Sequence, residues 1–133
     1  MTLIDINSTE YAGYYKRYID TVTKGVQLSD AYQKVGKLKK YMEKIPKVKL
    51  SYRYDEGKWS IKEVYQHIID TERVFAYRLF RIGRMDSTSL SGFNQDDFIE
   101  PSAADSKSLE LLHHEYCTTR ANTSAIIHSL SAD

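Results

Sequence analysis

The sequence has 133 residues, and 19 Lys and Arg against 18 Asp and Glu give a formal net charge of +1. This length predicts a single domain, residues 1–133, whose core is large enough to be stable without disulfides or a structural metal. The balanced charge argues against a protein that binds nucleic acid through excess positive charge. The single cysteine, Cys117, excludes a disulfide framework. With no apolar run long enough to span a membrane and no signal peptide, we expect a cytoplasmic protein.

Only 6 Gly and 2 Pro interrupt the chain, which favours long helices over the frequent turns of an all-β domain. The first predicted helix is short and begins at Glu10, after possible caps at residues 7–9, and Gly25 ends it. Its apolar face consists of Tyr11, Tyr14, Tyr15, Tyr18 and Val22. The second helix is predicted from about residue 28 to 45, because Pro46 follows its end. The apolar stripe of this second helix consists of Leu28, Ala31, Tyr32, Val35, Leu38 and Met42.

A basic stretch covers the end of the second helix and the residues after it. Eight basic residues lie between Lys34 and Arg53, and Glu43 alone opposes them there. The stretch is a candidate patch for nucleic acid, lipid headgroups or an acidic partner. We favour a solvated helix face, because the lysines alternate with core positions and no aromatic residues interleave to stack bases. We expect the basic stretch to be attracted to later acidic residues, either across the bundle or across a contact between subunits. These residues are Asp96, Asp97, Glu100 and Asp105.

The strongest local signal is the start of the third helix. Ser60 can cap the amide three residues on while Glu63 reaches back to the Ser60 amide, so the spacing predicts a capping box. The helix is predicted over residues 61–84, with Gly83 near its end. Its apolar stripe consists of Ile61, Val64, Ile68, Phe75, Leu79 and Ile82.

The connection over residues 85–102 is too long for a simple turn. It combines turn residues with isolated aromatic side chains, so it is expected to be ordered, as a functional loop or a long crossover. The last helix is predicted to begin near Asp105 or Ser106. One face of this last helix carries Leu109, Leu112, Tyr116, Thr123, Ile127 and Leu130.

Two charged residues fall on the apolar faces of these helices. Because successive residues of an α-helix are rotated by 100°, Glu72 falls inside the apolar stripe of the third helix. Arg120 likewise falls inside the apolar stripe of the last helix. An ionised carboxylate in a core is costly unless it is paired. We therefore predict an ion pair between Glu72 and Arg120 across the core, in preference to a catalytic role for Glu72.

The four histidines do not show the i, i+4 spacing with which one helix supplies two ligands to zinc. His67 is expected to face a neighbouring helix rather than water, as interhelical packing. His113 is expected at the edge of the core and His114 in solvent, while His128 points sideways. A thiolate pair between Cys117 and His113 is a further, less favoured reading.

The stretches 54–64 and 67–78, which include Trp59, Ser60, His67 and Glu72, resemble the DinB-like superfamily, close to its YfiT-like branch. The resemblance continues through residues 84–86, 90–98 and 108–120. It implies an all-α four-helix bundle with a long crossover, in which His67 is one of three ligands to a divalent metal such as nickel or zinc. The other two ligands in such proteins come from an H-x-x-x-H pair on a further C-terminal helix.

This chain ends at residue 133, before such a helix, so we expect a C-terminally short bundle of three long helices and one short N-terminal helix. The uncovered apolar faces predict self-association, most simply a homodimer.

The resemblance leaves two functions open. The first is a metal-dependent enzyme of the thiol-dependent transferase or hydrolase class, acting on a small-molecule thiol or another small substrate, with no nucleic acid or membrane as partner. In that enzyme Asp96, Asp97 or Glu72 orients a ligand or acts as base, and the residues do not decide which. The second is a metal-free helical module for oligomerisation or binding, in which His67 is only packing.

Overall fold

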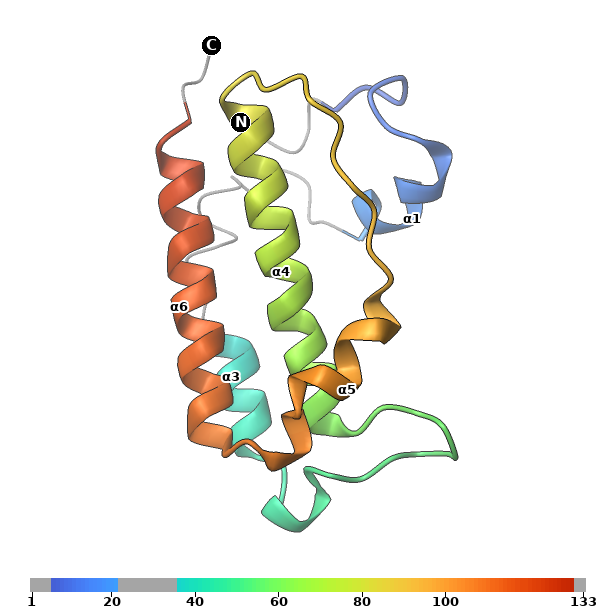
Figure 1. Ribbon diagram of the computed structural model, residues 1–133, viewed down its shortest axis with the longest axis vertical. Helices are drawn as coiled ribbons and strands as arrows, with labels where there is room; N and C mark the ends of the chain where they lie inside the picture. The colour runs from blue at the N-terminus through green and yellow to red at the C-terminus, as the bar shows by residue number, and fades with distance from the viewer. Residues whose placement is uncertain (1–5, 22–35, 131–133) are drawn as a thin grey trace.

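The computed structural model describes residues 6–21 and 36–130, and all regular elements in these ranges are helical (Figure 1). The predicted all-α fold is therefore confirmed. No helix in the described ranges combines the length and apolarity needed to cross a membrane. The α-helices are α1 (Lys16–Ile19), α3 (Gly36–Glu43), α4 (Ile61–Gly83), α5 (Ile99–Ser102) and α6 (Leu109–His128). Short 3-10 turns lie at Gly13–Tyr15, Lys47–Lys49, Gln95–Phe98 and Ala104–Ser106.

The N-terminal helix is much shorter than predicted. One 3-10 turn leads into the single turn of α1, and its tyrosines are exposed rather than buried, Tyr14 by 64% and Tyr18 by 51%. Both hydroxyls accept hydrogen bonds from Arg17, whose guanidinium lies 4.8 Å from each ring centroid. A single turn is not stable without packing, so the aromatic spacing alone did not suffice to form a longer helix here. The predicted end of this helix lies outside the described residues.

The second predicted helix is confirmed where it is described. Helix α3 ends at Glu43, before Pro46, with Met42 buried and Leu38 half-buried, as the stripe predicts. Residues 28–35, with the first four positions of that stripe, lie outside the described residues. The lysines of the basic stretch at positions 37, 40, 44, 47 and 49 are exposed, which agrees with a solvated face.

Helix α4 begins as predicted. The Ser60 hydroxyl accepts a hydrogen bond from the Glu63 amide at 3.1 Å, and the Glu63 carboxylate accepts one from the Ser60 amide at 2.7 Å. The predicted capping box is thus confirmed, and the helix ends at Gly83 rather than Arg84.

The buried face of α4 agrees only in part with the predicted stripe. Val64, Phe75 and Ile82, predicted as core, are 45%, 51% and 62% exposed, whereas Ile61 and Ile68 pack half-buried against the core as predicted. The buried positions of α4 are Tyr65, Gln66, Ile69, Glu72 and Ala76. The core consists of Met42, Leu50, Tyr65, Ile69, Leu112 and Tyr116.

Helices α4 and α6 run parallel, side by side (Figure 1). The Tyr65 hydroxyl is 2.9 Å from His113 Nδ1, and Glu72 pairs with Arg120 two turns further along both helices. Parallel neighbours require a connection that returns the chain to its starting level. Residues 84–108 make that return along the outside of α4, so the long connection is a crossover (Figure 1).

Helix α6 starts later than predicted. Asp105 and Ser106 belong to a separate 3-10 turn, and the helix begins at Leu109. The Ser108 hydroxyl accepts a hydrogen bond from the Leu111 amide at 3.1 Å and so provides the cap. The residue whose side chain caps a free backbone amide therefore sets the start of the helix, rather than the first residue that favours helix.

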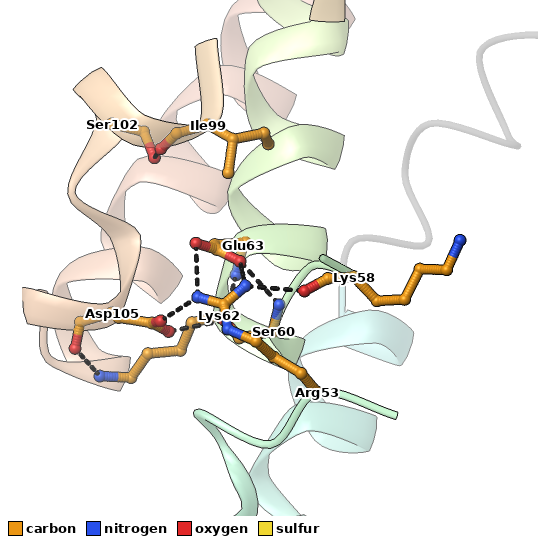
Figure 2. Close-up of polar contacts among 8 residues, drawn as sticks. All are labelled: Arg53, Lys58, Ser60, Lys62, Glu63, Ile99, Ser102 and Asp105. Atoms are coloured by element: carbon orange, nitrogen blue, oxygen red, sulfur yellow. Dashed lines mark hydrogen bonds and ion pairs between the residues drawn. The ribbon is translucent and has the colours of Figure 1, made fainter. Parts of the chain in front are cut away.

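A cluster of charges joins the start of α4 to the end of the crossover (Figure 2). We call it the N-terminal clasp: Arg53, Ser60, Lys62, Glu63 and Asp105. Arg53 pairs with Glu63 and, at 2.8 Å, with Asp105, whose other oxygen accepts a hydrogen bond from the Ser60 hydroxyl at 2.6 Å. Lys62 donates to the backbone oxygen of Asp105 at 3.0 Å. The predicted attraction between the basic stretch and the later acidic residues is thus confirmed for Arg53 and Asp105.

Replacement of Ser60 by Ala is expected to lower the free energy of unfolding by about 2 kcal/mol, because the fully buried hydroxyl both caps α4 and bonds Asp105. The matched control is Ser108→Ala, which removes an exposed cap with one hydrogen bond and is expected to cost about 1 kcal/mol. Urea unfolding measures both, and equal losses would contradict the role of the clasp.

Candidate functional site

The candidate site is a groove between α4 and α6, with a volume of about 460 Å³. Pockets of this size hold small organic ligands. Its walls are mainly apolar, while a few polar side chains stand at one end and at the base. We call it the α4–α6 groove, lined by His67, Ile68, Thr71, Glu72, Phe75, Ala76, Leu79, Arg120, Thr123 and Ile127.

His67 lies half-buried at the polar end of the groove. Its Nδ1 is 3.3 Å from the Thr71 hydroxyl, and its ring centroid is 4.8 Å from that of Trp59. When Nδ1 carries the proton and donates to Thr71, the lone pair is on Nε2, the arrangement that a metal-ligating histidine requires. The ring is thus held in place from two sides.

The crossover closes the other side of His67. Phe93 and Phe98 stack with ring centroids 5.5 Å apart, and together with Ile99 they pack against α4 beside His67. The crevice between them is too small for a water molecule. His67 thus packs against Trp59 and the crossover and also lines the α4–α6 groove, so the expectation that it faces a neighbouring helix rather than water holds only in part.

The predicted ion pair between Glu72 and Arg120 is confirmed at the base of the groove. Arg120 Nη2 is 2.7 Å from Glu72 Oε2, and the Glu72 side chain is only 8% exposed. The guanidinium also lies 5.4 Å from the Tyr116 ring centroid. Glu72 Oε1 is buried and has no hydrogen-bond partner within the described ranges. Since a lone buried charge is far more costly than a pair, each of the two residues depends on the other.

The two aspartates of the crossover do not join this site. Asp97 is exposed and accepts a hydrogen bond from the Asn94 side chain at 2.9 Å. Asp96 lines a different pocket, together with Glu63, Glu100 and Asp105. Of the three carboxylates considered as ligand-orienting groups or bases, only Glu72 shares a pocket with His67.

The remaining histidines lie elsewhere, as predicted for two of them. His113 is buried and His114 exposed, while His128 is exposed with Nδ1 2.7 Å from the Ser124 carbonyl. The hydrogen bond of His113 Nδ1 is with the Tyr65 hydroxyl rather than with Cys117. The less favoured interpretation, a thiolate pair between Cys117 and His113, is therefore not the contact that His113 Nδ1 makes. Cys117 instead packs half-buried against the core.

Within residues 6–21 and 36–130, no three His, Cys, Asp or Glu side chains come close enough to hold one metal ion. A catalytic zinc-type site needs about three protein ligands. The described residues do not complete such a set around His67.

A family model described as the DinB superfamily matches residues 32–133. The chain belongs to the DinB superfamily. The matched region contains α3, α4, the crossover and α6, and therefore both walls of the α4–α6 groove. Comparison with the curated proteins and with the solved structures found no match to this DinB-superfamily chain. The predicted family is confirmed, and its YfiT-like branch stays a prediction.

Sequence reasoning missed a polar network on the opposite edge of the α4–α6 contact. Gln66, only 1% exposed, accepts a hydrogen bond from Lys107 at 2.8 Å, and Lys107 also pairs with Glu115 at 2.7 Å. Arg73 pairs with the second oxygen of Glu115 at 2.9 Å. A glutamine directly after the buried Tyr65 was the available signal, but of its partners only Asp70 is near in sequence, while Lys107 and Glu115 lie more than 40 residues away.

Acid is expected to destabilise the protein through His113. Burial lowers the pKa of His113 below its ordinary value of 6.5. The unfolded chain then binds more protons than the folded one just below pH 6.5, so stability falls as the pH falls through that window. Between pH 7.5 and 5.5 we expect the thermal midpoint to drop by a few degrees. His113→Gln is expected to reduce this drop and the exposed control His114→Gln to retain it. Thermal melts at both pH values would contradict the assignment if the two variants behaved alike.

Proposed function

We propose that this DinB-superfamily chain belongs to a metal-dependent enzyme of the thiol-dependent transferase or hydrolase class. In this proposal His67 supplies one ligand to a divalent ion, nickel or zinc, and the α4–α6 groove holds a small substrate beside it. The observation that carries the proposal is the position of His67, whose ring lines the groove and is held there by Thr71 and Trp59.

The described residues contribute orientation and exclusion of water. The crossover packs without room for water on one side of His67, and apolar walls formed by Phe75 and Leu79 adjoin it on the other. The chemistry that a divalent ion supplies in such surroundings is a lowered pKa of a bound thiol or water. Since the described residues give one ligand, the further ligands must come from outside these residues or from a second copy.

Isothermal titration of the purified chain with nickel and with zinc tests the metal. The proposal expects binding with a stoichiometry near one, weakened by at least about 100-fold in His67→Ala, because loss of a ligand removes a bond to the ion. The matched control is His114→Ala, which removes an exposed histidine of α6 and is expected to leave the affinity unchanged. Weak binding that is insensitive to His67→Ala would contradict the proposed metal role.

A second candidate function is a metal-free module that associates through α4. It is favoured by one observation: Val64, Phe75 and Ile82 form an exposed apolar stripe along α4, each 45% exposed or more. A stripe of this kind is normally covered in an assembly. In this alternative the chain is a homodimer and His67 serves packing alone.

Sedimentation equilibrium tests the association. Phe75→Gln is expected to weaken a homodimer by at least about 10-fold, because burial of a phenylalanine contributes roughly 1.5–3 kcal/mol. The matched control is Tyr77→Gln, on the other side of the same helix and 56% exposed, which should change little. A wild-type chain that stays monomeric at high micromolar concentration would rule this alternative out.

A further inference from the structure

The α4–α6 groove contains an unusual polar atom. Glu72 is more than nine-tenths buried, and its Oε1 makes no hydrogen bond with any residue of the described ranges. A buried acceptor without a donor costs roughly 1–3 kcal/mol, so such atoms generally meet a ligand or a water. Glu72 lines the groove of about 460 Å³, and Oε1 itself has almost no surface open to water, so a ligand reaches this acceptor only when a neighbouring wall side chain moves.

The charge around this atom selects the kind of donor. Arg120 already neutralises Glu72 through the 2.7 Å contact with Oε2. A cationic ligand would have to leave water for a mainly apolar groove in which the described lining residues offer no negative charge besides Glu72, which is costly. A neutral donor, such as a hydroxyl or an amide N–H, satisfies Oε1 without bringing in a charge.

The apolar walls of the groove indicate the chemical character of the rest of the ligand. Ile68, Phe75, Leu79 and Ile127 face the space with aliphatic and aromatic surface. Phe75 is 51% exposed, so it is the wall that can most easily move to admit a molecule to the base. Apolar surface of this kind is best covered by a ring or a branched alkyl group.

We infer that the α4–α6 groove binds a small neutral amphipathic molecule, with its apolar body between α4 and α6 and a hydroxyl or amide donating to Glu72 Oε1. This inference rests on the proposed function, because it uses the same groove, and it names the class of substrate for that enzyme. The binding of the ligand requires no metal, so the inference and the proposed metal role can fail separately.

The experiment compares benzyl alcohol with toluene, which share a ring and differ in the donor. Both are titrated into the chain in the presence of EDTA, and the methyl signals of Ile68, Leu79 and Ile127 are followed by NMR. The expected result is that benzyl alcohol binds about 2- to 10-fold more tightly than toluene, the worth of one hydrogen bond. Equal affinities, or shifts confined to other methyl groups, would overturn the inference.

Two variants assign the effect to residues. In the double variant Glu72→Leu with Arg120→Leu both charges are removed together, so that neither is left unpaired, and toluene is expected to bind at least as well as benzyl alcohol. In Leu79→Trp the groove is filled, and both ligands are expected to lose binding. The matched control for added bulk is Leu111→Trp, at a half-exposed position of α6 outside the groove. A preference for benzyl alcohol that persists in the double variant would also overturn the inference.

The metal titration separates this result from the proposed function. If metal binding depends on His67 but benzyl alcohol is not preferred, the enzyme proposal stands and this class of ligand is ruled out. If benzyl alcohol is preferred but no metal binds, the groove remains a binding site and the proposed metal role is ruled out.

Discussion

The buried pairing of α4 with α6 is the constraint on which the rest of this structure depends. Tyr65 meets His113, and Glu72 meets Arg120, with the same sequence separation in both pairs. A shift of α6 by one turn would break both contacts at once and leave polar groups buried without partners, which is much more costly than a loss of apolar contact. The register is therefore set by polar atoms inside a mainly apolar contact, and the position of the groove follows from it.

Local signals made the best predictions. The capping box of Ser60 and Glu63 needs only residues three positions apart, and the structure contains it. The Glu72–Arg120 pair was also predictable, because a buried carboxylate needs a cation and few cations lie on apolar faces. By contrast, the choice of buried face on α4 depends on the neighbouring helices. An apolar position such as Val64 fits a core or a partner surface equally well, so its spacing alone could not show that it is exposed.

The site was predictable only in part, and for a similar reason. The resemblance of the sequence singled out His67, and the structure brings Glu72 into the same groove, while Asp96 and Asp97 lie elsewhere. Nothing in the spacing of the chain indicated Trp59 as the ring beside His67, since eight residues separate them across a helix start. Contacts made by the irregular segments, above all the crossover, decide how each polar group of this site is surrounded.

The ends of α4 and α6 meet in an apolar contact. Gly83, the last residue of α4, lies so close to Leu130, just after α6, that a β-carbon added at Gly83 would overlap the leucine side chain. The atom in the way is the end of that side chain and not backbone, so a larger residue fits there once Leu130 turns aside. The two helices therefore meet at this end through a contact that can adjust, whereas the polar pairs Tyr65–His113 and Glu72–Arg120 hold them in a fixed register further along.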